Sequence, residues 1–372
     1  MTPGPTQVKE NVRMARSLVC TNPDLDEDFV EFYKDTCELI SSLLGTKNET
    51  LILDGEGILG LEAACASLTE PGDKVLVIEN GVYGEGFADF VSMYGGVPEF
   101  YHADRLNAID PDALSSYLKE HHDYKYATVV HCDTPSGMLN PVEKICPLLK
   151  EYGILTVVDS VSGMFGNHMD VDKFQIDLLC GGSQKAVSAP PGLTFVTISD
   201  AVKDAMHERK TPIRSFYASL LAFEGYYEKK WFPYTMPISD IYGLRAAFDN
   251  IASDPELEER THRIAEAARR ALTEAGLKLH LESGFSDTVT VFDIPAETTC
   301  DAILSRMKKE HNIMLAGSFD DLSGKVIRIG HMGNNANFED MAATMYALSE
   351  TLTFLGVNLK GDLTGLFLKY YH

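Results

Sequence analysis

The sequence predicts an α/β protein with a mostly parallel, doubly wound sheet in a large domain and a smaller α+β domain after it. Short β-branched runs recur along the first 200 residues, and each run is apolar almost throughout. Such runs are typical of parallel strands that helices cover on both faces. Longer amphipathic stretches separate the runs, and this alternation favours a doubly wound sheet.

The expected strands of the large domain follow one another at helix-length intervals. They are residues 74–79, 127–131, 154–159, 176–180 and 193–198. Helical patterns lie at Pro111–Glu120 and Val142–Tyr152. We therefore expect residues 1–240 to form the large domain, with the ligand site at the carboxyl ends of its strands.

Residues 241–372 are expected to form the smaller domain. An Ala-, Glu- and Arg-rich stretch predicts one long helix over 241–275. The elements expected after it are a strand at 289–294, a helix at 300–311, a strand at 325–330 and a helix at 338–355. The closing segment LKGDLTGLFLKYYH is expected to leave its aromatic residues exposed.

Composition narrows the classes of partner. The 372 residues include 32 Lys and Arg against 55 Asp and Glu, a formal net charge of −23. Such an acidic surface repels nucleic-acid backbones and anionic membranes. No apolar run is long enough to span a membrane, and the first residues lack the apolar core of a secretory signal. Seven cysteines without a CxxC pair indicate a reduced, cytoplasmic chain.

Lys185 is the strongest candidate for a reactive residue. It lies in GGSQK between two expected strands and is followed by APPG. A single loop lysine is usually a solvated one. A lysine amine with a lowered pKa, however, forms a Schiff base with an aldehyde.

Asp159 supports that interpretation, because it ends the strand ILTVVD at the edge where α/β sheets bind ligands. Alone, it could simply cap a following helix. If Asp159 lay beside the protonated nitrogen of a pyridoxal ring, its charge would stabilise that protonated form, in which the ring withdraws electrons from a bound substrate. Asp159 and Lys185 on consecutive expected strands are far more specific together than either is alone.

The segments VDSVSG and GGSQKAVSAPPG resemble the class V aminotransferases of the type I pyridoxal-phosphate fold. The resemblance covers nearly the whole chain, through PGPT, GLEAA, NGVYG, DTPSG and RIG. It is greatest with alanine–glyoxylate, serine–pyruvate and pyridoxamine–pyruvate transaminases. It implies a transaminase that moves an amino group between an amine or amino acid and a 2-oxo acid, either pyruvate or glyoxylate.

The resemblance also implies roles for single residues around a pyridoxal 5′-phosphate. Lys185 would form the Schiff base and shuttle a proton, and Asp159 would pair with the ring nitrogen. Tyr83 would stack on one face of the ring and Val161 would pack on the other, while Thr134 would reach the ring hydroxyl. The plainer alternatives are core packing for Tyr83 and turn formation for Thr134.

Three further residues would bind substrate or complete the site. Arg328 would grip the substrate carboxylate with both arms of its guanidinium, although an arginine late in a strand is more often a surface ion pair. Gly4 would offer its backbone to the same carboxylate. Thr235 would come from the partner subunit, so a homodimer with shared active sites is expected.

The residues at the phosphate end depart from the phosphate-using relatives. Glu56, Gly57 and Ile58 precede the expected helix LEAACASL, and a helix N-terminus is a natural anion site. Alanine–glyoxylate transaminases have serine or threonine in place of Glu56 and tyrosine in place of Phe232, whereas Gln184 is retained. The Glu56 carboxylate would repel a phosphate, unless it turns aside and only complements the helix dipole.

Two readings of the substrate therefore stay open. The first is a pyridoxamine–pyruvate-like enzyme that binds unphosphorylated pyridoxal or pyridoxamine as a substrate. The second is a pyridoxal-phosphate-dependent alanine or serine transaminase. Phe319 occupies the place of a second arginine of the pyridoxamine–pyruvate enzyme, which leaves the acid substrate open.

Two more distant functions are disfavoured. A desulfurase or other lyase of this fold usually has histidine before its lysine, where this chain has Gln184, and needs a cysteine on a mobile loop. A non-catalytic pyridoxal-binding module would have no need of both Lys185 and Asp159.

Overall fold

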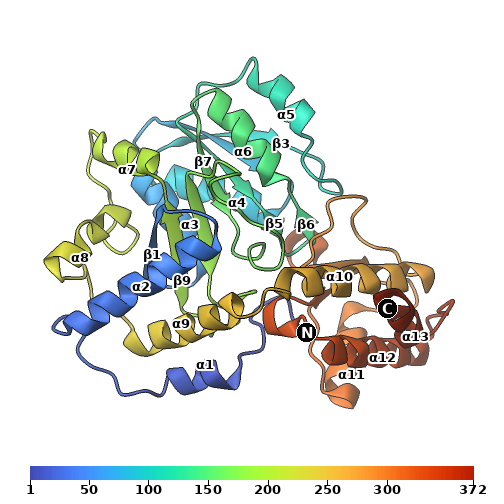
Figure 1. The fold of residues 1–372 in the computed structure, drawn as a ribbon. Coiled ribbons are helices and arrows are strands. Elements are labelled where there is room, and N and C mark those ends of the chain that lie inside the picture. The colour runs from blue at the N-terminus through green and yellow to red at the C-terminus, as the bar shows by residue number, and fades with distance from the viewer.

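The computed structural model describes residues 1–372, and a seven-stranded sheet forms its centre (Figure 1). Its order is β1-β9-β8-β7-β4-β2-β3. β9 runs antiparallel to both neighbours and the other pairs are parallel, which confirms the predicted mostly parallel sheet. The strands are β1 (Glu49–Asp54), β2 (Lys74–Glu79), β3 (Val97–His102), β4 (Tyr126–Val130), β7 (Leu155–Asp159), β8 (Leu178–Gly182) and β9 (Leu193–Ile198).

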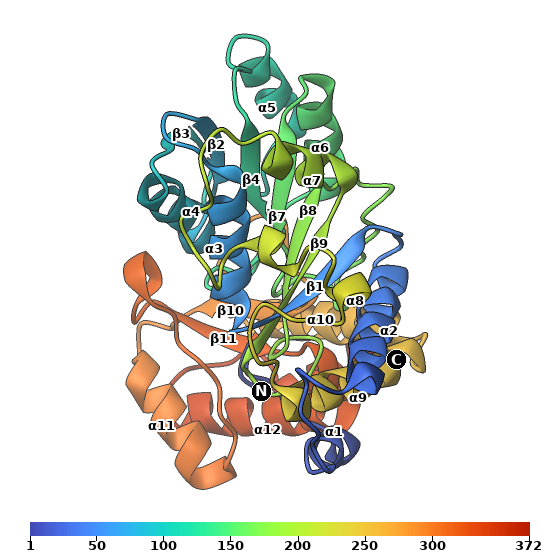
Figure 2. The ribbon, with the colours of Figure 1, turned by 90° about the vertical axis from the view of Figure 1, so that its left-hand side faces the viewer.

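Helices cover both faces of this sheet. Figure 2 shows α3 (Gly57–Leu68) and α4 (Val82–Met93) on one side, and α2 (Glu27–Leu43) and α6 (Val142–Glu151) on the other. The other helices of this lobe are α1 (Glu10–Ala15), α5 (Pro111–Leu118), α7 (Asp200–His207), η1 (Leu220–Phe223), α8 (Tyr226–Lys229) and α9 (Ile238–Ala252). Some helix starts carry side-chain caps. At the start of α5, for example, the side chain of Asp110 accepts the backbone N–H of Asp112.

The edge strands β1 and β3 were not expected from the sequence. β3 contains Pro98 and is half exposed, so it lacks both an apolar run and a full ladder of donors. A second, two-stranded sheet of β5 (Cys132–Asp133) and β6 (Met138–Leu139) is also too short to give a pattern.

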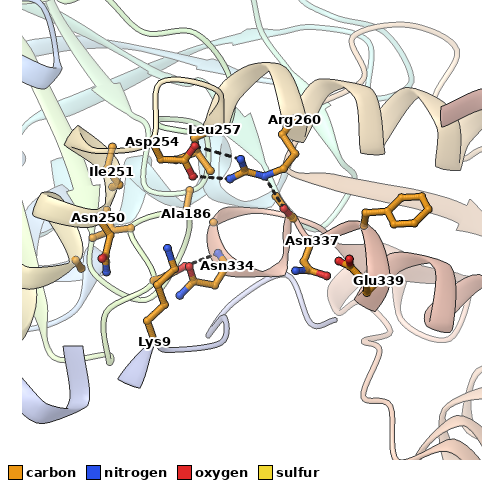
Figure 3. Close-up of a pocket in the computed structure, with 16 residues that line it drawn as sticks. Lys9, Ala186, Asn250, Ile251, Asp254, Leu257, Arg260, Asn334, Asn337 and Glu339 are labelled. Carbon is orange, nitrogen blue, oxygen red and sulfur yellow. Dashed lines mark hydrogen bonds and ion pairs between the residues drawn. The ribbon is translucent and has the colours of Figure 1, made fainter. Parts of the chain in front are cut away.

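The single long helix predicted over 241–275 is wrong. The chain forms α9 and then α10 (Leu257–Glu274), with Pro255 in the turn between them. Proline lacks an N–H and disfavours helical geometry in the residue before it, so the helix ends there. Figure 3 shows Arg260 facing Asp254 across this turn, with Nη2 to Oδ2 at 2.7 Å.

The helices α10–α13 gather into the smaller lobe (Figure 1). It holds α11 (Cys300–His311), α12 (Phe338–Phe354), α13 (Leu363–Tyr371), the short turns η2 (Asp320–Leu322) and η3 (Gly333–Asn335), and the antiparallel pair of β10 (Val289–Asp293) and β11 (Val326–Gly330). The tail is not exposed as expected, because Phe367 of α13 is fully buried in the core of this lobe.

The buried apolar residues form two main cores. The larger one includes Ile241 and Phe248 of α9, and the smaller one includes Ile264 and Leu272 of α10. A domain boundary after residue 240 stays a prediction, and this packing favours a boundary at the turn after α9.

The first residues run between the two lobes, where the N-terminus lies in Figure 2. The N–H of Thr6 donates to the carbonyl of Gln184 in the large lobe, and the carbonyl of Met1 accepts from Gly330 in the small one. Not one of the helices has the length and apolar character needed to cross a membrane.

Candidate active site

A cavity of about 280 Å³ opens where β7 and β8 end and α3 begins. Asp159 is the last residue of β7, and Lys185 follows the end of β8. Ten of the sequence-predicted site residues line this cavity: Gly4, Glu56, Gly57, Ile58, Tyr83, Thr134, Asp159, Val161, Gln184 and Lys185.

The Lys185 side chain is held at the floor of this cavity by the N-terminal segment. Its Nζ donates to the carbonyl of Pro3 at 2.8 Å, and burial lowers the pKa of its ammonium group. Gly4 has a φ of +102°, and a Cβ there would collide with the Lys185 side chain. A lysine amine with a lowered pKa is a competent nucleophile.

Asp159 is buried and lacks a cationic partner within ion-pair distance. One of its oxygens accepts the N–H of Val161 at 2.9 Å. Burial raises the pKa of this carboxyl to about 7. A protonated pyridine nitrogen would supply the missing partner, because an opposite charge nearby favours the ionised carboxylate.

Tyr83, Val161 and Thr134, which the resemblance places around the ring, all line the cavity. Tyr83 lines one side, half-buried, and the methyl groups of Val161 approach Gly57 so closely that a Cβ at Gly57 would lie 2.9 Å from one of them. The Thr134 hydroxyl lies 3.3 Å from that of Ser162.

At the far end, Glu56 caps α3. One carboxylate oxygen accepts the N–H of Ile58 at 3.3 Å, and the other accepts Nε2 of Gln184 at 3.0 Å. The Oε1 atom of Gln184 is buried without a hydrogen-bond partner. A carboxylate thus occupies the helix N-terminus, where a bound phosphate would otherwise lie.

A second cavity, of about 570 Å³, adjoins the first and shares Gly4, Tyr83, Thr134 and Lys185 with it. Arg328 of β11 enters it. The guanidinium donates Nε to the carbonyl of Gly317 at 2.5 Å and Nη1 to that of Thr134 at 3.4 Å. Burial lowers the pKa of Arg328, and no carboxylate in the chain pairs with it. The group can therefore receive a carboxylate from a ligand.

Two predicted site residues lie elsewhere. Phe232 is buried in the core of its own subunit, with the centre of its ring 5.6 Å from that of Tyr226. Its role beside a cofactor stays a prediction. A phenyl ring without a hydroxyl gains more from this burial than from exposure. Thr235 is exposed, and its hydroxyl donates to Asp24 at 3.2 Å. Its contribution across an interface stays a prediction.

The structure adds residues that the sequence reasoning missed. Cys132, Ser162 and Pro191 line the first cavity, and the Pro3 carbonyl holds the lysine. Ser162 and Pro191 lie within the quoted motifs and could have been found there. Cys132 ends a buried apolar run and resembles a core residue, and a backbone carbonyl has no sequence signal.

The family model of class V aminotransferases matches residues 8–316, so the chain belongs to this family. An uncharacterized aminotransferase of Methanocaldococcus jannaschii is 34% identical over 97% of this chain and 94% of its own length. The pyridoxamine–pyruvate transaminase of Mesorhizobium japonicum is 31% identical over 90% of this chain and 87% of its own.

Among solved structures, the ureidoglycine–glyoxylate aminotransferase of Bacillus subtilis superposes with a TM-score of 0.95 at 27% identity. The match covers all of this chain and 97% of the other. The fold and the family thus make this protein an aminotransferase of small amino and oxo acids. The family uses pyridoxal 5′-phosphate. The unpartnered Asp159 fits its ring nitrogen, and the buried amine of Lys185 fits its aldehyde.

Proposed function

We propose that the protein is a pyridoxamine–pyruvate-like transaminase that prefers unphosphorylated pyridoxal and pyridoxamine over their phosphates. The observation that carries the proposal is the Glu56 carboxylate at the N-terminus of α3, bonded to Gln184. The similarity to the pyridoxamine–pyruvate transaminase of Mesorhizobium japonicum supports it.

The physical reason is competition for one anion site. The N–H of Ile58 in the first turn of α3 and the amide of Gln184 would be natural donors to a phosphate, and the Glu56 carboxylate already accepts from both. Two like charges about 4 Å apart repel by about 4 kcal/mol at an effective dielectric near 20. Solvent and side-chain movement reduce this, so we expect a discrimination of about one to two orders of magnitude.

The other residues of the site each have a separate role in the proposed transamination. The bound ring supplies an electron sink for bond breaking at the substrate α-carbon. Asp159 holds a proton on the ring nitrogen, and the Lys185 amine carries the proton to and from the α-carbon. Tyr83 and Val161 hold the ring between them, while Arg328 orients the substrate carboxylate.

A second candidate is a pyridoxal-phosphate-dependent alanine or serine transaminase acting on pyruvate or glyoxylate. One observation favours it. Glu56 is exposed on the outer side of the cavity, so its carboxylate can swing toward solvent and release the Gln184 amide. The helix N-terminus and this amide would then receive a phosphate.

We also propose a homodimer with shared active sites. The segment between α7 and α9 exposes Phe216, Tyr217 and Trp231, which is unusual for aromatic residues of a monomer. This segment packs on α3, where the Ser67 hydroxyl accepts from Leu220. The seven cysteines are all free, which supports a reducing compartment such as the cytoplasm.

The test compares pyridoxamine with pyridoxamine phosphate. Binding and single-turnover transamination are measured with pyridoxamine and with its phosphate, for the unmodified chain and for Glu56→Ser. Serine removes the charge and opens the anion site, so the preference should shift toward the phosphate by about tenfold or more. Glu56→Gln is the matched control, because it removes the charge but keeps the volume, and it should shift the preference less.

Borohydride reduction followed by peptide mass measurement identifies the ring bound to Lys185. The chain is first incubated with equal amounts of pyridoxal and pyridoxal 5′-phosphate. The proposal requires that the Lys185 peptide then carries the mass of the unphosphorylated ring. Two results together would favour the alanine or serine transaminase instead. The chain would purify with one phosphorylated ring per subunit, and Glu56→Ser would leave the preference between pyridoxamine and its phosphate unchanged.

A further inference from the structure

Lys185 is held at its backbone as well as at its amine. Its carbonyl oxygen accepts the hydroxyl of Thr6 at 2.8 Å and the N–H of Ser188 at 2.9 Å. The N–H of Thr6 also donates to the carbonyl of Gln184 at 3.0 Å. Thr6 therefore binds the carbonyl groups directly before and after the α-carbon from which the Lys185 side chain extends.

The direction of the hydrogen bonds around Thr6 follows from the number of protons. Its hydroxyl also lies 3.1 Å from that of Ser188. A hydroxyl has one proton to donate, and the proton of Thr6 goes to the Lys185 carbonyl, which can only accept. The Ser188 hydroxyl therefore donates to Thr6, and it accepts the backbone N–H of Asn334 at 2.9 Å. These hydrogen bonds form a hydroxyl chain that runs from the Asn334 N–H through Ser188 and Thr6 to Lys185.

The hydroxyl chain joins three segments that are distant in the sequence. Thr6 belongs to the N-terminal segment between the lobes, and Ser188 belongs to the turn after Lys185. Asn334 lies in the η3 turn of the small lobe (Figure 3). Thr6 and Ser188 are both buried, so a donor of the chain that lost its acceptor would not find water in its place.

Two backbone features show how closely the small lobe approaches the lysine turn. Ser188 has a φ of +59°, a left-handed conformation that residues other than glycine keep only where their surroundings hold them. Gly333 has a φ of +55°, and a Cβ there would collide with the Ser188 hydroxyl and the Ala186 carbonyl. Gly333 follows β11, the strand that carries Arg328.

We propose that Thr6 and Ser188 are positioning residues for Lys185, and that they transmit to it the position of the small lobe. This inference rests on the Schiff-base role proposed for Lys185 and extends it to two residues that act through its backbone. A carboxylate bound at Arg328 steadies the lobe whose Asn334 N–H begins the chain. The lysine amine is thus directed into the ring cavity while the small lobe is docked.

The experiment follows the reaction of Lys185 with pyridoxal in the ring-free chain by visible absorbance. Peptide mass after borohydride reduction identifies the lysine, and urea unfolding shows that each variant is folded. Thr6→Val keeps the volume but removes the hydroxyl, so it should slow the reaction by about fivefold or more. Thr6→Ser keeps the hydroxyl and should restore the rate. Thr344→Val removes a buried hydroxyl from α12, outside both cavities of the site, and should leave the rate unchanged.

A second set of variants tests the contact with the small lobe. Gly333→Ala places a Cβ against Ser188 and should slow the reaction about as much as Thr6→Val. Gly324→Ala is the matched control, because Gly324 has a φ of +70° and open space around it, so alanine adds similar backbone strain without a collision. Ser188→Ala combined with Thr6→Val should be little slower than either single variant, since both break the same chain.

Three results would overturn the inference. The first is an unmodified rate in Thr6→Val, the second is a Thr6→Ser variant as slow as Thr6→Val, and the third is a Gly333→Ala variant no slower than Gly324→Ala. The reaction is measured both with pyridoxal and with pyridoxal 5′-phosphate. A faster reaction with the phosphate would contradict the proposed function, yet it would leave the comparison among the variants intact.

Discussion

Burial decides the chemistry of the single residues in this site. Asp159 and Lys185 are both buried, and burial moves their pKa values in opposite directions, because it penalises the charged form of each. The carboxyl tends to keep its proton and the amine tends to lose one. The ring-free site is thus prepared for a ligand that brings a positive charge to Asp159 and an aldehyde to Lys185.

The raised pKa of Asp159 predicts a pH-dependent stability in the ring-free protein. Its carboxyl titrates near 7 in the folded chain against an ordinary value of 3.8, so the folded state holds the extra proton between these values. The contribution of Asp159 to stability is fully present below pH 4 and is lost as the pH rises through 7. This difference in pKa corresponds to about 4 kcal/mol of folding stability.

Urea unfolding of the ring-free chain and of Asp159→Asn, from pH 4 to pH 8, measures this loss. The unmodified chain should lose stability relative to the variant over that range, and added pyridoxal should restore part of it. The exposed Asp123→Asn serves as the control and should give a constant difference. A constant difference for Asp159→Asn as well would contradict the prediction.

Arg328→Lys should raise the KM for the oxo acid by about tenfold or more. Lysine keeps the charge but loses the planar fork that holds a carboxylate at two points. A hydrogen bond to a charged group contributes about 1.5–3 kcal/mol, which corresponds to this change. Steady-state kinetics measure it, with Arg13→Lys on the exposed face of α1 as the control. An unchanged KM would remove Arg328 from the substrate site.

At the scale of elements, the site is built from segment ends that meet at the domain junction. The end of β7, the loop after β8 and the start of α3 come from the large lobe, and β11 comes from the small one. The loop from Gly317 to Leu322 joins the two lobes through Arg105 and Asp321. The substrate site is therefore complete only when this loop lies against the large lobe.

Arg105→Gln should loosen that loop and raise the KM for the oxo acid by about two- to fivefold, with little change in kcat. Exposed ion pairs contribute about 0.2–1 kcal/mol, which sets this range. Kinetics of Arg105→Gln, Asp321→Asn and the double variant form a cycle that isolates the pair. Strictly additive effects would show that the two residues act separately.

At the scale of the whole molecule, residues of both lobes line a further cavity of about 290 Å³. Figure 3 shows Ala186, next to Lys185 in the chain, among the residues that line it. Arg260 crosses this junction, because it pairs with Asp254 at 2.7 Å and donates to the carbonyl of Ala336 at 3.0 Å. The lysine loop thus lies between two cavities, and movement of one lobe against the other would reach it directly.

The exposed aromatic segment predicts that the active form is a dimer. Replacing Trp231 by Asp should raise the dimer dissociation constant by about tenfold or more, since it places a charge in an apolar interface. Sedimentation measures the association, and Trp231, the single tryptophan, reports it by fluorescence in the unmodified chain. Phe354→Asp, on the exposed end of α12, is the control. A fully active monomer would refute the shared site.

Much of the fold could be predicted because strands and helices leave local patterns. The strand expected at 74–79 coincides with β2, and the helix expected at 300–311 coincides with α11. The elements that were predicted wrongly or not at all also have local explanations. Pro255 divides a continuous helical pattern, and β3 is a half-exposed edge strand with a proline.

The sequence by itself determined the inner strands of the sheet and the location of Asp159 and Lys185 at one edge of it, because both follow from patterns within a few residues. Only the tertiary structure decided which side chains face the ligand. The bond between Glu56 and Gln184 joins residues 128 positions apart, and the bond between Asn334 and Ser188 depends on how one lobe docks on the other. Phe232 lies in the core because its neighbours Tyr33 and Tyr226 enclose it. Such contacts depend on packing between distant segments, which no local pattern of residues records.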